Sequence, residues 1–136
     1  MSQNSHHFPP PVERIQRNLL ALAERRLLDW LCARMPGWAS PDLMTAIGMA
    51  GAMAVMAGYA ASAADPRWLA LSVVGYVVNW FGDSLDGSLA RWRRIERPNY
   101  GYFLDHSCDA MATVLIVGGL GLSPHISAEA ALCAVV

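Results

Sequence analysis

The sequence contains no lysine, and all ten of its basic residues are arginine. Because eleven acidic residues balance them to a formal net charge of −1, nucleic acid is not expected as the main partner. Cysteine is scarce too: the three cysteines are odd in number and lack the spacing of a zinc site. Cys32 and Cys108 fall on the reducing side of the topology argued below, so we expect no disulfide.

Charged side chains are missing from three long stretches of a chain that is 54% apolar. Residues 43–64 carry none, and a helix of that length spans about 33 Å, which is enough for a bilayer. Residues 68–82 and 110–124 reach membrane length when they are extended to about residue 91 and from about residue 100. We therefore predict an all-α integral membrane protein with three transmembrane helices, the second and third of which are half apolar and half acidic.

The two ends of the chain differ from this central part. Residues 1–11 are polar and rich in proline, so we expect them to be disordered, and they lack the pattern of a cleavable signal peptide. Residues 126–136 are mostly apolar but too few to cross a bilayer. We expect the start of a fourth transmembrane helix, in a transmembrane domain that covers residues 40–136 and is truncated at its C-terminus.

Residues 12–36 are predicted to form an amphipathic helix in the membrane interface, because apolar residues recur there at helical spacing between arginines and acids. Trp30 would lie at the boundary. The alternative is a helix that packs on a partner protein. Nine arginines lie in this segment or in residues 91–97, and only Arg67 lies in the opposite loop. The positive-inside rule then predicts a cytoplasmic N-terminus, and we interpret most of these arginines as topology and headgroup charges.

The start of the first transmembrane helix is predicted at Pro41, with Ser40 as its N-cap. Small residues are frequent in this helix and favour close packing against a neighbour in lipid. One row of them consists of Ala46, Ala50 and Ala54, with Gly48, Gly51 and Gly58 nearby.

Four aspartates lie within the otherwise apolar second and third predicted helices. Asp83 and Asp86 are three residues apart, and Asp105 and Asp109 are four apart, so each pair shares one helix face. The two pairs lie at matching distances from a turn near residues 95–96, so all four carboxylates can converge near the cytoplasmic face. Two divalent cations would relieve their repulsion, and all-oxygen ligation suits Mg²⁺, Mn²⁺ or Ca²⁺. The same carboxylates could instead carry protons or cations through a transporter.

Small residues and one arginine accompany the carboxylates. Gly87 and Ala90 leave space beside the predicted metals, and Gly101 lies one turn before Asp105, where a phosphate could approach the backbone. Arg91 could reach that phosphate. The alternatives are that the glycines only allow helices to touch and that Arg91 is another topology charge.

The pattern Asp-x2-Asp-Gly-x2-Ala-Arg-x9-Gly-x3-Asp-x3-Asp resembles the signature of the CDP-alcohol phosphotransferase (CDP-alcohol phosphatidyltransferase) family. The chain carries it from Asp83 to Asp109. The segment Ser40 to Thr45 is similar to the opening of the family's first helix, with Asp42 where Asn is common. The resemblance implies six transmembrane helices in the whole fold and a homodimer.

The resemblance also implies a reaction and the residues for it. A CDP-linked alcohol would bind through its diphosphate to two Mg²⁺ or Mn²⁺ ions, a second hydroxyl would attack, and CMP would leave. Asp83, Asp86, Asp105 and Asp109 would be metal ligands, with Asp109 also the general base. The residues expected to line the substrate site are Gly87, Ala90, Arg91 and Gly101, together with Asp42 and Thr45 from the first helix.

Two branches of the family differ in their substrates. One uses CDP-diacylglycerol and a small alcohol, and the other uses CDP-choline or CDP-ethanolamine and diacylglycerol. The sequence Asp105-His106-Ser107-Cys108-Asp109 resembles the second branch. We therefore expect a phospholipid-synthesis enzyme in a multi-pass membrane protein. A divalent-cation or proton-coupled transporter is the alternative.

Overall fold

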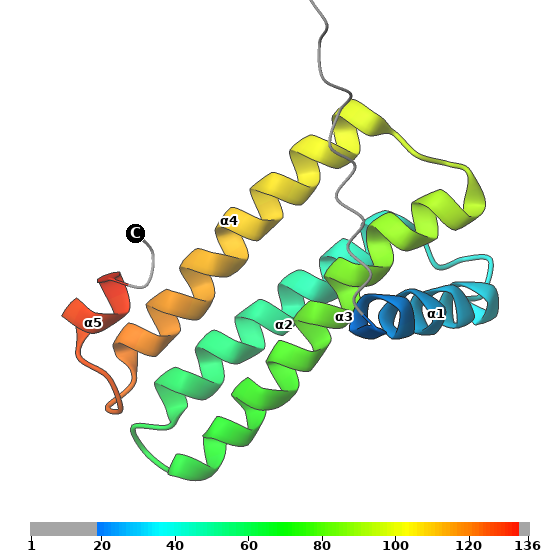
Figure 1. The fold of residues 1–136 in the computed structure, drawn as a ribbon. Helices are drawn as coiled ribbons and strands as arrows, with labels where there is room; N and C mark the ends of the chain where they lie inside the picture. Colours follow the sequence, from blue (N-terminus) through cyan, green and yellow to red (C-terminus); the bar gives the residue numbers. More distant parts are fainter. Residues whose placement is uncertain (1–18, 134–136) are drawn as a thin grey trace, which may run out of the picture.

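The computed structural model describes residues 19–133, and every regular element in that range is helical, as expected (Figure 1). The elements are α1 (Leu19–Arg34), α2 (Pro41–Ala61), the short 3₁₀ helix η1 (Pro66–Trp68), α3 (Leu69–Arg93), α4 (Pro98–Leu122) and α5 (Ala128–Cys133). The segment predicted to be disordered, and residues 12–18 of the predicted interfacial helix, lie outside the described residues.

Helix α2, predicted as the first transmembrane helix, begins where the sequence predicts. Pro41 occupies its first turn, and the Leu43 amide donates a hydrogen bond of 3.1 Å to the Ser40 hydroxyl oxygen. This bond satisfies one of the amides that the start of a helix leaves without a partner. In the turn that follows α2, the Asp65 carboxylate accepts a hydrogen bond of 2.9 Å from the Arg67 amide at the start of η1.

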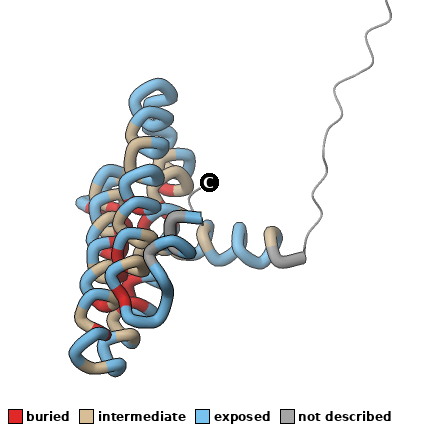
Figure 2. The backbone as a smooth tube through the Cα atoms, turned by 90° about the vertical axis from the view of Figure 1, so that its left-hand side faces the viewer, coloured by how far each residue is buried: buried red, intermediate tan, exposed pale blue. Residues whose placement is uncertain are grey.

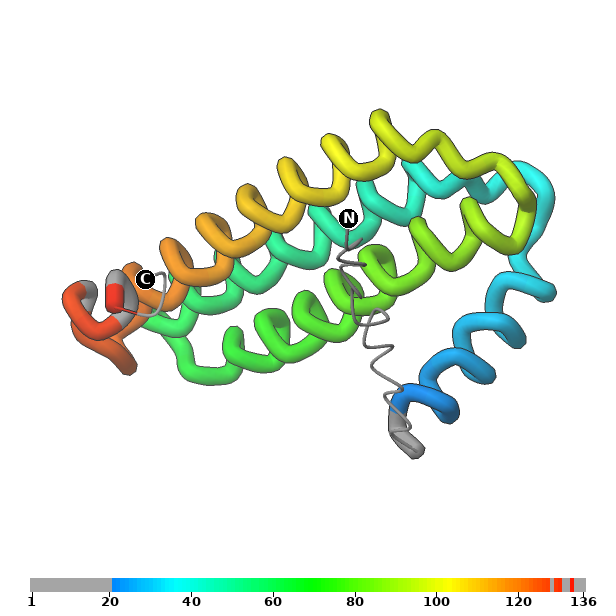
Figure 3. The backbone as a smooth tube through the Cα atoms, turned by 45° about the horizontal axis from the view of Figure 1, so that its top comes forward, coloured from blue at the N-terminus to red at the C-terminus, as the bar shows by residue number. Residues whose placement is uncertain are grey.

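Helix α2 lies between α3 and α4 and packs along both of them (Figure 3). The α2–α3 interface is the more extensive, whereas the backbones of α3 and α4 barely approach each other over their described lengths. The two acidic helices are therefore neighbours of α2 rather than of each other.

Glycine makes the α2–α3 contact possible. A Cβ atom at Gly51 would lie 2.4 Å from the Asn79 nitrogen, and one at Gly82 would lie 2.4 Å from the Gly48 nitrogen. The predicted alanine row is not the packing row in this structure, because Ala46 and Ala50 are exposed. The residues of α2 that are buried instead are Met44, Gly48, Gly51, Ala52, Val55 and Gly58.

Within residues 19–133, two helices are long and apolar enough to cross a membrane, namely α2 and α4. Helix α3 has the same length as α4, 25 residues, but its C-terminal half carries aspartates and arginines. Its outer face is nonetheless apolar and exposed at Val73, Val77 and Trp80. Figure 2 shows the buried residues concentrated where the long helices meet, with exposed surface around them. Because α3 is not among the two candidate spans, a third transmembrane helix stays a prediction.

Helix α1 projects sideways from the three long helices (Figures 1 and 2). Leu28 and Leu31 pack against the cluster that contains the buried side chains Cys32, Leu85 and Leu89. Burial raises the pKa of the Cys32 thiol, and Cys32, Cys108 and Cys133 are free in this structure. Leu22, Leu27 and Trp30 stay exposed, which leaves an apolar surface on α1 for lipid or a partner.

Arg93, interpreted from the sequence as a topology charge, has a specific structural partner. Its guanidinium donates hydrogen bonds to main-chain carbonyls of the connector between α1 and α2, including that of Pro36 at 2.8 Å and that of Ala39. Further contacts of 3.4 Å reach the Met35 and Gly37 carbonyls. Because one side chain binds several carbonyls of this connector, the end of α3 is tied to the segment that leads into α2.

Candidate metal and substrate site

Three of the four aspartates in the motif lie close together. One carboxylate oxygen from each of Asp83, Asp105 and Asp109 lies within 4.8 Å of the other two, and all three residues are exposed. Helix α3 supplies the first, and α4 supplies the other two from successive turns of one face. The predicted convergence of the two helices' carboxylates is therefore present for these three residues.

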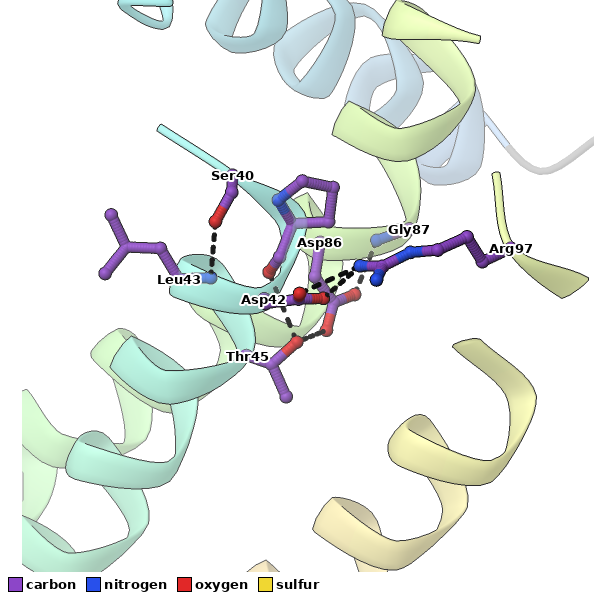
Figure 4. A network of polar contacts seen from close by, with 8 residues as sticks. Ser40, Asp42, Leu43, Thr45, Asp86, Gly87 and Arg97 are labelled. Carbon is purple, nitrogen blue, oxygen red and sulfur yellow. Dashed lines mark hydrogen bonds and ion pairs between the residues drawn. The ribbon is translucent and has the colours of Figure 1, made fainter. Parts of the chain in front are cut away.

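Asp86 lies outside this group and is held by its own contacts. The Thr45 hydroxyl on α2 donates a hydrogen bond of 2.7 Å to Asp86 Oδ2, and the Gly87 amide donates to Asp86 Oδ1 (Figure 4). Bonds to an ionised carboxylate are among the strongest hydrogen bonds in proteins. They orient Asp86 and still leave lone pairs on both oxygens for a further ligand.

Two neighbouring cavities bring the predicted site residues together. The larger, of about 450 Å³, is lined by nine of the ten, namely Asp42, Thr45, Asp83, Asp86, Gly87, Ala90, Arg91, Gly101 and Asp105. The tenth, Asp109, lines a smaller cavity of about 20 Å³ together with the other three motif aspartates. The smaller cavity has room for about one water-sized group, and the larger is in the size range of small-molecule sites.

The residues around the small cavity fit a hard divalent cation. Their carboxylate oxygens are the ligands that Mg²⁺ and Mn²⁺ prefer, and the nearby thiol of Cys108 does not complete a zinc ligand set. Repulsion among carboxylates this close also favours a bound cation. The donor set therefore supports a divalent metal centre, and Asp86, which also lines the small cavity, could supply a further ligand.

Gly87 and Gly101 are not needed for helix packing in this structure. A Cβ atom at Gly101 would meet no atom within 4 Å, and one at Gly87 would meet only the guanidinium of Arg91, from 3.3 Å. Both residues line the larger cavity, as does the half-buried Ala90. Their missing side chains leave backbone accessible to whatever fills the cavity, in contrast to the tightly packed Gly51.

Arg91 is exposed at the wall of the larger cavity. Its Nη2 donates a hydrogen bond of 3.2 Å to the Ser88 hydroxyl, one turn earlier on α3. Among the residues that the structure describes, this is the only hydrogen bond of the Arg91 side chain, so most of its five N–H donors could bind an anion in the cavity.

A second arginine at the cavity was not singled out from the sequence. Arg97 Nη2 lies 2.7 Å from Asp42 Oδ1 and 2.8 Å from Oδ2, and this pair joins the start of α4 to the start of α2 (Figure 4). Hydrogen bonding to Asp42 raises the pKa of the Arg97 guanidinium above its ordinary value. No local pattern could have revealed this contact, because its partners are 55 positions apart.

Asn79 was missed as well, although a signal was present. It lines the small cavity and donates a hydrogen bond of 3.0 Å from Nδ2 to the Gly48 carbonyl. It lies one helical turn before Asp83, on the same face, within an otherwise apolar stretch. A polar residue at that spacing could have been included with the motif.

Comparisons with known proteins agree with these observations. Residues 38–136 match the family model described as CDP-alcohol phosphatidyltransferase. Cholinephosphotransferase 1 of Danio rerio is 28% identical over 122 residues, which cover 79% of this chain and 32% of that protein. Cholinephosphotransferase 1 of Gallus gallus is 29% identical over 125 residues, covering 82% of this chain and 37% of that protein. The chain thus spans about a third of these curated relatives. No solved structure gives a significant match.

Proposed function

The chain belongs to the CDP-alcohol phosphatidyltransferase family, and we propose that it transfers a phospho-alcohol group from a CDP-linked donor to a hydroxyl acceptor and releases CMP. One observation carries the proposal. The carboxylates of Asp83, Asp105 and Asp109 lie close together at a cavity that nearly all the other residues of the family-like motif line. An acidic metal centre beside a cavity with free backbone and a guanidinium suits a diphosphate substrate.

The four motif aspartates, Asp83, Asp86, Asp105 and Asp109, would hold two divalent ions, Mg²⁺ or Mn²⁺. When bound, such ions neutralise the donor's diphosphate and make an oxygen nucleophile easier to deprotonate. Thr45 would keep Asp86 oriented through its hydrogen bond. The chain's own contribution is thus a preorganised set of oxygen ligands on two helices, held at one depth.

The other cavity residues would bind the donor. Arg91 would donate hydrogen bonds to its phosphates. Gly87 and Gly101 would let the nucleotide approach the backbone, and the small side chain of Ala90 would leave space beside it. Asp42 and Thr45 would face the nucleotide from α2. Support comes from their shared position on the wall of one cavity.

In the transfer step, the acceptor hydroxyl oxygen would form a bond to the phosphorus distal to cytidine, and the bond from that phosphorus to the CMP oxygen would break. CMP would leave with the electron pair. Asp109 would accept the hydroxyl proton as general base, which requires only that the acceptor lie within hydrogen-bond reach of its carboxylate. The product would be a phosphodiester.

For the substrates, we favour a CDP-amino-alcohol donor, CDP-choline or CDP-ethanolamine, and a diacylglycerol acceptor. The His106–Cys108 part of the motif and the names of the similar proteins support this branch. CDP-diacylglycerol with a small alcohol is the alternative within the family. The family match gives the transporter interpretation no support.

The family match and the two candidate spans indicate a membrane protein. We propose that the N-terminus and the α3–α4 turn face the cytoplasm, which the clustering of arginines at that end supports. Helix α1 would lie in the interface with Trp30 and its exposed leucines in the headgroup region. We also propose a homodimer, as the family resemblance implies.

The test is CMP release by the full chain reconstituted in lipid, with Mg²⁺ or Mn²⁺. One arm pairs CDP-choline or CDP-ethanolamine with diacylglycerol, and the other pairs CDP-diacylglycerol with glycerol phosphate, serine or inositol phosphate. We expect release in the first arm, abolished by EDTA and restored by either metal. Release only in the second arm would move the chain to the other branch. Release in neither arm would contradict the proposed reaction.

A further inference from the structure

The cluster of three carboxylates is shared between two helices that do not pack on each other. Asp83 lies on α3, whereas Asp105 and Asp109 lie on α4, and the backbones of these helices barely approach. Direct packing between them therefore does not set the distance across the group. Contacts with α2, which packs along both helices, therefore hold the acidic part of α4 at its separation from Asp83.

The first two turns of α2 supply a contact to each acidic helix. Thr45 holds Asp86 on α3, and Asp42 holds Arg97 at the start of α4 (Figure 4). Asp42 lies directly after Pro41, the first residue of α2, and this part of the chain is fixed in turn by the bonds from Arg93 to the α1–α2 connector. The start of α2 thus contacts both acidic helices and can fix the position of each relative to the other.

Arg97 is well placed to orient α4. It is the N-cap residue of that helix, its carbonyl accepts a bond of 2.6 Å from the Gly101 amide, and its guanidinium lies 4.4 Å from the centre of the Tyr100 ring. Asp105 and Asp109 follow Gly101 at intervals of four residues, on one face of the helix. A displacement of the first turn would therefore move both carboxylates.

We propose that Arg97 is a positioning residue, which through its ion pair with Asp42 sets the separation between the α4 carboxylates and Asp83 and thereby the affinity of the site for a divalent cation. This inference rests on the proposed function, which takes the carboxylates as metal ligands. The side chains of the pair are 54% and 46% exposed. Because exposed ion pairs add little to global stability, the loss of this one should leave the fold intact and change local geometry.

The sign of the effect separates positioning from simple electrostatics. Arg97 is a cation near a group of carboxylates, so its removal should strengthen divalent binding if only net charge matters. If Arg97 positions α4, its removal should weaken binding. Removal of Asp42 weakens binding under both interpretations, so Arg97→Gln is the decisive variant.

The experiment measures Mn²⁺ affinity of the full chain in lipid nanodiscs, from the electron paramagnetic resonance signal of free Mn²⁺. Arg97→Gln and Asp42→Asn are each expected to weaken binding about 10- to 100-fold, the usual effect of losing an outer-shell partner. The double variant should be no weaker than either single variant, because both remove the same contact. Arg94→Gln is the matched control and should bind Mn²⁺ as the wild type does.

Unchanged or tighter Mn²⁺ binding by Arg97→Gln would overturn the proposal, and so would losses that add in the double variant. Thermal unfolding of each variant is measured alongside, and the charge-swapped pair Asp42→Arg with Arg97→Asp should recover most of the affinity if the contact itself matters. A higher KM for the CDP-linked donor with unchanged Mn²⁺ affinity would make Arg97 a donor ligand instead. Coupled Mn²⁺ losses without any CMP release by the wild type would reject the proposed reaction and retain the positioning role.

Discussion

Thr45 on α2 donates its hydroxyl hydrogen to Asp86 on α3, over 2.7 Å and across 41 positions of sequence. The bond makes α2 part of the proposed metal centre, although α2 contributes no aspartate to the cluster of Asp83, Asp105 and Asp109. It also gives Asp86 an orientation that its own helix does not impose. Thr45 was expected at the nucleotide, and the structure gives it a second role.

Thr45→Val keeps the shape of the side chain and removes the donor. Because hydrogen bonds to charged groups are worth about 1.5–3 kcal/mol, we expect Mn²⁺ affinity to fall at least about tenfold. A Mn²⁺ titration measures this, and Thr45→Ser should retain most of the affinity. A rise in donor KM alone, with normal Mn²⁺ binding, would show that Thr45 serves only the nucleotide.

Substitution by alanine should lower stability at Gly51 but should affect only donor binding at Gly101. At Gly51 the new Cβ would lie 2.4 Å from a backbone nitrogen, so α2 and α3 must separate. Overpacking of this kind costs about 1–3 kcal/mol, which unfolding in mixed micelles would detect. At Gly101 the Cβ has open space, so Gly101→Ala should unfold as the wild type does and raise the KM for the donor. Equal destabilisation by both changes would contradict the distinction between packing and cavity glycines.

Asp109→Asn tests the general base. The amide cannot accept the hydroxyl proton, so we expect CMP release to fall by about 10²- to 10⁴-fold while CMP binding is largely retained. Turnover assays and calorimetric titration with CMP in the presence of Mg²⁺ measure the two effects. Asp29→Asn, on the exposed part of α1, is the control and should be unaffected. Normal turnover by Asp109→Asn would remove its role as base.

Arg91→Ala tests whether this arginine binds phosphate. Loss of charged hydrogen bonds worth about 1.5–3 kcal/mol predicts donor binding weaker by about 10- to 150-fold. Metal affinity should change much less, because Arg91 lies outside the carboxylate group. Arg94→Ala, three residues further along, provides the comparison. Unchanged donor affinity would leave Arg91 as a topology charge.

Much of the fold followed from local patterns. The uncharged stretches, the Ser40 cap and the acidic pairs predicted three long helices close to where α2, α3 and α4 lie. Helical periodicity also placed Asp105 and Asp109 on one face, at the depth of Asp83. These properties depend on residues within a few turns of each other, and the backbone geometry of a helix is the same in any surroundings.

Which helices touch, and through which residues, required the packed structure. The alanine row and the glycines of α2 both consist of small residues, and only the position of α3 shows that Gly48 and Gly51 are the ones covered. Arg91, Arg93 and Arg97 carry the same charged group, yet Arg91 bonds to Ser88 on its own helix, Arg93 binds the α1–α2 connector and Arg97 pairs with Asp42 on α2. Contacts between residues more than 40 positions apart depend on how side-chain volumes fit between helices, and no periodicity along one helix contains that information.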